Sequence, residues 1–238
     1  MSVLTLVRHG QASYMSEDYD RLSEVGERQA RKLGEYWVRR GIKFHNVFSG
    51  PAKRHLRTAQ IVADCFRDAG LPWPEPVVVP ALDEFDAFQM MKAITPILVE
   101  RDPLVRDLHA RFAASQQTPQ AGEMLQELFE AVARHWSSGE FDVPALESWA
   151  SFRKRIAGGI SEVRSTCNGD AAVAFTSGGP IAATTGLALD LSHLRSVELL
   201  WLSRNCSYSE YLVSNEHFLL ASFNSHPHLE ENTLLTYR

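Results

Sequence analysis

The feature that most constrains the fold of this chain is the alternation of short apolar segments with segments of helical spacing. The apolar segments at residues 3–7, 47–48 and 77–79 have the composition of buried strands. Helical patterns separate them, so each strand is joined to the next by a long connection. Such alternation predicts an α/β fold of three layers, in which a mainly parallel sheet carries helices on both faces.

Local signals mark the ends of the first two helices. Ser23 is a suitable N-cap for a helix whose apolar face includes Leu33, and Gly41 follows where a left-handed residue would end that helix. The second helix is expected to begin at Pro51, because proline loses nothing in a first helical turn. Gly70 is expected to end it.

The pattern changes between residues 85 and 142, where helical spacing dominates. One apolar stripe in this region consists of Leu125, Leu128, Phe129, Val132 and Trp136. We interpret residues 1–238 as a single domain that contains a helical insert at 85–142. Two interpretations of the insert stay open: a lid over the active edge of the sheet, or extra helices packed on the core.

After the insert, the alternation of helices and strands returns. Helical spacing at 149–163 precedes a strand candidate at 171–175, and Gly178 then stands at the start of a further helical segment. The segments expected to close the sheet as strands are 197–202, 208–213 and 218–223.

Composition argues against several classes of protein. The formal net charge is −5 and the pI is about 6.0, so a basic surface for nucleic acid is not expected. The cysteines Cys65, Cys167 and Cys206 are far apart, which argues against a disulfide framework or a zinc site and favours a reduced, cytoplasmic chain. No stretch approaches the roughly 18 apolar residues of a membrane span, so no membrane partner is expected.

Arg8, His9 and Gly10 carry the first chemical signal, because open α/β sheets bind ligands at the carboxyl ends of their strands. An unprotonated imidazole nitrogen is a competent nucleophile. A neighbouring guanidinium can hold the oxygens of a phosphoryl group, and a glycine lets the backbone approach that group closely. A histidine in a loop is more often structural, however, so this motif needs support from distant positions.

That support comes from four segments in a fixed order. They are LVRHGQAS at 6–13, LSEVGERQA at 22–30, FSGPAKRHLRTAQ at 48–60 and LDE at 82–84. Together they resemble the motifs of the histidine phosphatase superfamily, whose fold is phosphoglycerate mutase-like. The tail from Asn205 to Leu229 is also similar to the family, so the resemblance covers both ends of the chain.

The resemblance implies a role for each matched residue. His9 would be the nucleophile that accepts the phosphoryl group, and Arg8 and Arg54 would bind its oxygens. Glu84 would donate a proton to the leaving oxygen, and partial burial should raise its pKa for that role. Without the resemblance, Glu84 would be interpreted as a surface carboxylate. The implied partner is a small phosphorylated substrate, and no metal or cofactor is implied because the arginines neutralise its charge.

One position departs from the family pattern. Where the family has a second histidine followed by two glycines, this chain has Ser177 followed by Gly178. The serine hydroxyl and the helix N-terminus at Gly178 can still bind phosphate. Serine is shorter and uncharged, and loss of a charged contact to a transition state costs about two to three orders of magnitude in rate. Compensation by another histidine, such as His226, is a hypothesis.

Two hypotheses of function follow. The first is a phosphatase that hydrolyses a small phosphomonoester through a phosphohistidine on His9. The alternative is a catalytically weak or inactive relative that binds a phosphorylated ligand or a protein partner, which Ser177 favours. Glycolytic mutase activity is not expected, because residues 85–90 replace the aromatic-rich segment of true phosphoglycerate mutases. Phe85 and Phe88 either line the substrate pocket or pack among the helices. The sequence makes no prediction of oligomeric state.

Overall fold

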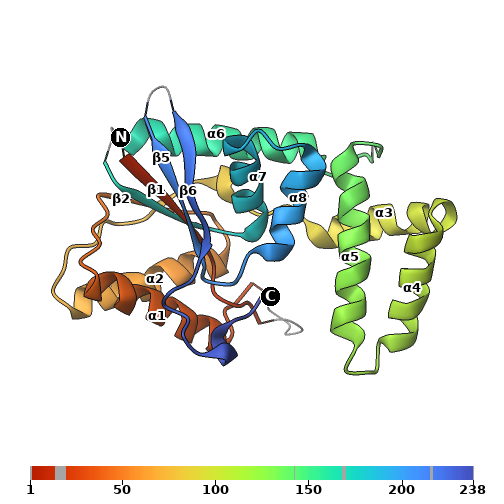
Figure 1. Ribbon diagram of the computed structural model, residues 1–238, viewed down its shortest axis with the longest axis horizontal. Helices are drawn as coiled ribbons and strands as arrows, with labels where there is room; N and C mark the ends of the chain where they lie inside the picture. Colours follow the sequence, from red (N-terminus) through yellow and green to blue (C-terminus); the bar gives the residue numbers. More distant parts are fainter. Residues whose placement is uncertain (1, 14–19, 142, 168–169, 215–216, 238) are drawn as a thin grey trace.

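The computed structural model describes residues 2–13, 20–141, 143–167, 170–214 and 217–237 (Figure 1). Its sheet has six strands in the order β3-β2-β4-β1-β5-β6. The strands are β1 (Ser2–Arg8), β2 (Asn46–Ser49), β3 (Val77–Val78), β4 (Ala172–Thr176), β5 (Tyr208–Val213) and β6 (Phe218–Ser225). The first four strands are parallel, and β5 and β6 add an antiparallel edge. The predicted mainly parallel α/β sheet is confirmed.

Helices cover both faces of the sheet, as its alternating side chains require. In β4, Ala172 and Ala174 belong to one buried apolar cluster, whereas Val173 and Phe175 belong to a second. The second cluster is covered by α1 (Glu24–Arg39) and α2 (Lys53–Asp68). The first is covered by α6 (Trp149–Cys167), α7 (Gly178–Ala188) and α8 (His193–Leu202), which lie on the other side of the sheet in Figure 1.

The local signals at the helix ends are largely confirmed. The Ser23 side chain accepts a hydrogen bond of 3.0 Å from the N–H of Gly26 and so caps α1. Gly41 and Gly70 have φ values of +65° and +68°, as glycines just after a helix often do. Helix α2 begins at Lys53, two residues later than predicted, and Pro51 lies in the bend before it.

The prediction of a strand at 197–202 is wrong, because these residues belong to α8. The Ser192 side chain accepts a hydrogen bond from the N–H of Arg195 and so caps this helix. Arg195 also forms an ion pair with Glu198, one turn along. A short apolar run does not by itself distinguish a strand from a buried helix. The strands predicted at 208–213 and 218–223 are confirmed as β5 and β6.

Three helices occupy most of the interval 85–142 and extend to the right in Figure 1. They are α3 (Ala87–Arg101), α4 (Pro103–Ser115) and α5 (Ala121–Ser138); 3₁₀ turns η1 (Pro80–Leu82) and η2 (Asn232–Leu234) complete the elements. Helix α5 packs against α8, where the rings of Phe129 and Trp201 are 5.5 Å apart. Asp142, at the end of the interval, lies outside the described residues.

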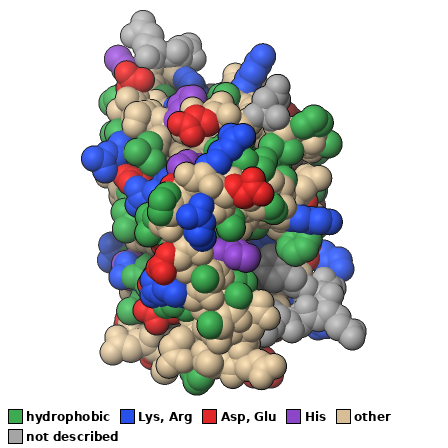
Figure 2. Space-filling view, turned by 90° about the vertical axis from the view of Figure 1, so that its right-hand side faces the viewer, with side chains coloured by type: hydrophobic (Ala, Val, Ile, Leu, Met, Phe, Trp, Pro, Cys, Tyr) green, Lys and Arg blue, Asp and Glu red, His purple; other side chains and the backbone are tan. Residues whose placement is uncertain are grey.

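The face formed by this helical region carries both signs of charge. Figure 2 looks onto it from the right-hand side of Figure 1, and lysine and arginine side chains lie among aspartate and glutamate. Several form pairs, such as Arg111 with Glu127 at 3.2 Å. Within the ranges that the structure describes, no helix is both long and apolar enough to cross a membrane.

Candidate active site

The carboxyl ends of three parallel strands meet at one edge of the sheet. Arg8, the last residue of β1, pairs with Thr176, the last residue of β4. The N–H of His9 donates to the Thr176 carbonyl at 2.9 Å, and the N–H of Gly50, after β2, donates to the Phe175 carbonyl at 2.8 Å. His9 and Ser177 therefore follow neighbouring strands, where sheets of this kind bind their ligands.

The His9 imidazole is held in the form that a nucleophile needs. Its Nδ1 lies 2.7 Å from the carbonyl oxygen of Gly10, an acceptor, so Nδ1 carries the hydrogen. Nε2 then has a free lone pair and accepts a hydrogen bond of 3.2 Å from Nε of Arg54. Burial, followed by the charge of Arg54, holds the pKa of His9 well below its ordinary value. The ring is therefore neutral.

Arg54, in the first turn of α2, joins both strand ends. Besides its contact with His9, its Nη2 donates to Oγ of Ser177 at 3.3 Å. Its Nη1 forms a 2.6 Å ion pair with Asp20, whose carboxylate also accepts from the N–H of Lys53 at 2.8 Å. Asp20 thus holds both the arginine and the start of its helix. No motif in the sequence singles out Asp20, and this contact was not predicted.

Arg8 supplies the second guanidinium at this edge. Its Nη1 donates to the carbonyl of Ser203, at the end of α8. Gly178 faces the same group, because a Cβ built on Gly178 would lie 3.5 Å from Nε of Arg8. The charge of Arg8 also lowers the pKa of His9 and of Glu84, so Arg8 acts electrostatically on both groups.

Glu84 lies across the site, just after η1. One carboxylate oxygen accepts from the N–H of Gly179 at 2.9 Å, and the other accepts from the N–H of Phe85 at 3.1 Å. Burial raises the pKa of Glu84 above its ordinary value, although both N–H groups and the charges of Arg54 and Arg8 oppose this. A Cβ on Gly179 would lie 1.9 Å from Glu84 Oε1, so the carboxylate position requires glycine there.

Gly10 has a packing role besides the close approach to phosphate predicted for it. A Cβ built on Gly10 would lie 2.4 Å from the carbonyl oxygen of Gly26, so α1 rests directly on the loop after β1. The N–H of Gly10 donates to Oγ1 of Thr58 at 3.1 Å, and that hydroxyl donates to the Arg54 carbonyl at 2.7 Å. The first and third sequence motifs are therefore joined directly.

Ser177 contacts an imidazole that was not among the predicted site residues. Its Oγ lies 2.5 Å from Nε2 of His55, the residue after Arg54. His226, the histidine that the sequence suggested, instead pairs through Nδ1 with the Asn224 carbonyl at 2.7 Å. Consecutive residues of a helix point about 100° apart around its axis. The predicted position of Arg54 at the site therefore did not indicate where the His55 side chain would point.

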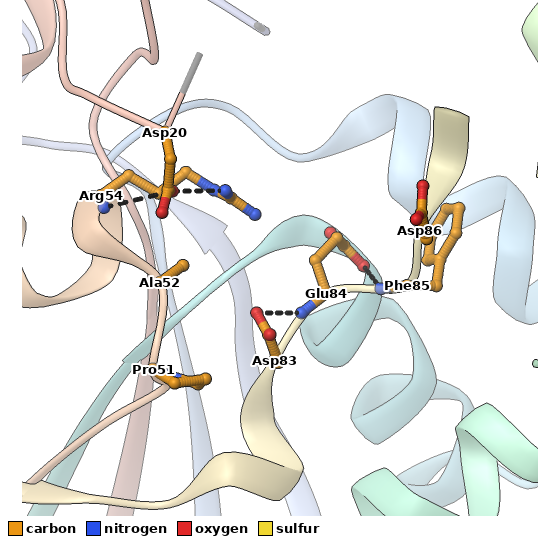
Figure 3. Close-up of a pocket in the computed structure, with 8 residues that line it drawn as sticks. All are labelled: Asp20, Pro51, Ala52, Arg54, Asp83, Glu84, Phe85 and Asp86. Carbon is orange, nitrogen blue, oxygen red and sulfur yellow. Dashed lines mark hydrogen bonds and ion pairs between the residues drawn. The ribbon is translucent and has the colours of Figure 1, made fainter. Parts of the chain in front are cut away.

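A hollow of about 410 Å³ opens between Arg54 and Glu84. Figure 3 shows the residues that line it: Asp20, Pro51, Ala52, Arg54, Asp83, Glu84, Phe85 and Asp86. Phe85 does both things considered for it, since it lines the hollow and packs against Trp136 of α5 at 4.6 Å between ring centroids. Phe88 neither packs nor lines the hollow, because 79% of its surface is exposed.

The sequence matches a family model for the histidine phosphatase superfamily (branch 1) over residues 4–135 and 116–226. The chain therefore belongs to the histidine phosphatase superfamily. Among the residues that the structure describes, no group of three or more histidine, cysteine, aspartate or glutamate side chains is arranged to hold a metal ion.

Solved structures agree on the fold. A variant of the Entamoeba histolytica phosphoserine phosphatase, in complex with phosphoserine, is similar with a TM-score of 0.62 and 18% identity over 96% of this chain and all (100%) of that one. Phosphoglycerate mutase from Bacillus anthracis has a TM-score of 0.62 and 16% identity, over 96% of this chain and 95% of that one. Mycobacterial glucosyl-3-phosphoglycerate phosphatase has a TM-score of 0.61 and 17% identity, over 94% of this chain and 99% of that one. The fold is phosphoglycerate mutase-like.

Proposed function

We propose that this protein is a phosphatase that hydrolyses a small phosphomonoester through a phosphohistidine on His9. The observation that carries the proposal is the state of the His9 ring. Nδ1 is tied to the Gly10 carbonyl, and Nε2 offers its lone pair beside the guanidinium of Arg54. A neutral, oriented imidazole next to an oxyanion-binding group is the arrangement that phosphoryl transfer to histidine requires.

In the first step, Nε2 of His9 attacks phosphorus and the bond to the leaving oxygen breaks. Arg8 and Arg54 hold the equatorial oxygens and balance their charge. The protonated Glu84 carboxyl transfers its proton to the leaving oxygen, so the alcohol departs neutral. The raised pKa of Glu84 suits it to this role. Phosphohistidine and a Glu84 carboxylate remain.

In the second step, water attacks the phosphorus and the bond to Nε2 breaks. Glu84 accepts a proton from that water, which restores the carboxyl group, and His9 leaves as a neutral ring. Inorganic phosphate is released. Ser177 and the N–H of Gly178 are assigned here to binding phosphate oxygens, because both stand at the N-terminus of α7 beside Arg54 and Arg8.

The rim of the hollow suggests the chemistry of the leaving group. Asp83 and Asp86 line the side of the hollow opposite Arg54 in Figure 3. Carboxylates there repel a second anionic group on the substrate and favour hydroxyl or ammonium groups. We therefore expect phosphoethanolamine to be a better substrate than 3-phosphoglycerate. Replacement of Asp83 by asparagine should narrow the difference in kcat/KM between them.

The test of the proposed function compares wild type with His9→Ala on p-nitrophenyl phosphate and a panel of small phosphate esters. We expect turnover in the wild type and its loss in the variant. Phosphohistidine is labile in acid and stable in alkali, so the wild type quenched during turnover of a ³²P-labelled ester should keep its label in alkali and lose it in acid. A folded wild type without turnover above His9→Ala would contradict the proposal. It would favour the binding relative that the presence of Ser177 suggests.

A further inference from the structure

Ser177 occupies the N-cap position of α7, yet its side chain does not cap that helix. A serine there usually accepts a hydrogen bond from the second or third N–H of the helix. Its Oγ instead lies 2.5 Å from Nε2 of His55 and 3.3 Å from Nη2 of Arg54. The hydroxyl therefore gives up its usual local partner for two groups on α2.

The position of His55 is defined by close packing. Its side chain is fully buried, and its ring lies tilted by 41° at 5.6 Å from the ring of His9. A Cβ built on Gly50 would lie 2.5 Å from Nδ1 of His55 and 2.8 Å from the Leu82 carbonyl oxygen. The ring thus fills the space that the missing side chain of Gly50 leaves, which directs Nε2 at Ser177.

The two nitrogens of His55 differ in their surroundings. Within the described part of the chain, buried Nδ1 has no hydrogen-bond partner. A buried N–H without an acceptor is rarer than a bare lone pair, so the ring hydrogen is best placed on Nε2, where Ser177 Oγ can accept it. Burial and the charge of Arg54 keep the pKa of His55 well below its ordinary value, which leaves the ring neutral.

This arrangement fixes the direction of the serine hydroxyl. Oγ has two lone pairs and one hydrogen. Arg54 donates to one lone pair and His55 donates to the other, so the hydrogen must be donated to a third group. The same guanidinium also contacts Nε2 of His9, so Ser177 and the attacking nitrogen share Arg54 as a neighbour.

We propose that His55 is a positioning residue that acts through Ser177, orienting its hydroxyl as a hydrogen-bond donor to the phosphoryl group of the substrate. The sequence resemblance predicts a second histidine at the position of Ser177. His55 supplies an imidazole at this end of the site from α2, and Ser177 lies between that imidazole and the phosphoryl position. The inference rests on the proposed function, because it assigns the same site a further part of its machinery.

The test is a double-mutant cycle of His55→Ala and Ser177→Ala, measured as kcat and KM on p-nitrophenyl phosphate. Each single variant should lower kcat by about 10- to 100-fold, since an oriented donor acts mainly on the transition state. The double variant should be no worse than either single variant, because both remove the same hydrogen bond. His55→Gln, whose amide N–H can reach Ser177, should recover part of the loss, whereas His55→Leu should not.

A purely structural His55 predicts a different pattern. His55→Ala would then reduce activity by the same factor whether position 177 is serine or alanine, and Gln and Leu would behave alike. Either result, or an unchanged kcat in folded His55→Ala, would overturn the inference. Thermal unfolding of each variant separates loss of fold from loss of orientation.

A second measurement keeps this inference separate from the proposed function. Orthovanadate imitates the five-coordinate phosphoryl group, and its binding can be measured without turnover. If the wild type binds orthovanadate but hydrolyses nothing, the proposed function fails. The inference is still supported if His55→Ala binds orthovanadate at least 10-fold more weakly than the wild type. It also requires that the double variant and Ser177→Ala bind orthovanadate equally well. A wild type that neither binds orthovanadate nor hydrolyses the esters would overturn both.

Discussion

The ends of β1 and β4 lie side by side, yet they build their parts of the site differently. The end of β1 carries its own chemistry, because Arg8 and His9 are consecutive and Gly10 supplies the acceptor that orients the ring. The end of β4 carries a serine whose partners both come from α2. Because parallel strands bring several elements to one edge, a functional group can reach this site from any of them.

The largest expected effect comes from Arg54, which contacts both strand ends. In Arg54→Lys, a single ammonium group replaces the guanidinium, whose three nitrogens contact His9, Ser177 and Asp20 in the wild type. We expect kcat/KM to fall by about 10²- to 10³-fold. Arg57→Lys is the matched control, since Arg57 is half-exposed on the same helix and pairs with Glu27. Equal losses in the two variants would show that a general effect on α2 is responsible.

Glu84→Gln should reduce turnover by a factor that depends on the leaving group of the substrate. The amide cannot donate an acidic proton, so turnover of alkyl phosphates should fall by about 10²- to 10³-fold. Turnover of p-nitrophenyl phosphate should fall much less, because its leaving oxygen departs without a proton. The pH profile of the wild type gives a second readout. Activity should decline as pH rises through the raised pKa of Glu84, and this alkaline limb should disappear in the variant. A uniform loss across leaving groups would exclude the proton-donor role.

Gly179→Ala disturbs the contact between Glu84 and the start of α7, which follows β4. The added Cβ would lie 1.9 Å from the Glu84 carboxylate. The carboxylate must then move away from the N–H of Gly179, from which it now accepts a hydrogen bond. We expect a loss of about 10-fold in kcat for alkyl phosphates, because the proton donor is displaced but not removed. Gly158→Ala is the control, since nothing lies within 4 Å of its Cβ on α6. That substitution should leave kcat unchanged, and a similar loss in both variants would contradict the argument.

The last expected effect is on stability, not activity, and appears at acidic pH. Burial lowers the pKa of His9 and His55, so below about 6.5, the ordinary value, the unfolded chain binds protons that the folded chain does not. The free energy of unfolding should therefore fall as pH falls, by up to about 1.4 kcal/mol per pH unit for each such histidine. Urea denaturation between pH 7 and 5 should give a shallower decline for His55→Gln.

The comparison also shows which predictions succeeded. Ser23 and Gly41 are local signals, since each acts on a helix within a few residues, and the structure has both as predicted. The segment 197–202 failed because its apolar run has no decisive period, and packing on α7 decided its conformation. The ordered motifs led to Arg8, His9, Arg54, Glu84 and Ser177, which the structure brings to one edge of the sheet.

The sequence by itself determined the alternation of elements, and with it the parallel sheet whose strand ends hold the motifs. It also determined that position 177 lacks a histidine. Only the tertiary structure decided what replaces it, because Ser177 and His55 are 122 positions apart. Their contact depends on how α2 is rotated against the sheet and on the space beside Gly50. Neither property is encoded in a local pattern, since both arise from packing between elements distant in the chain.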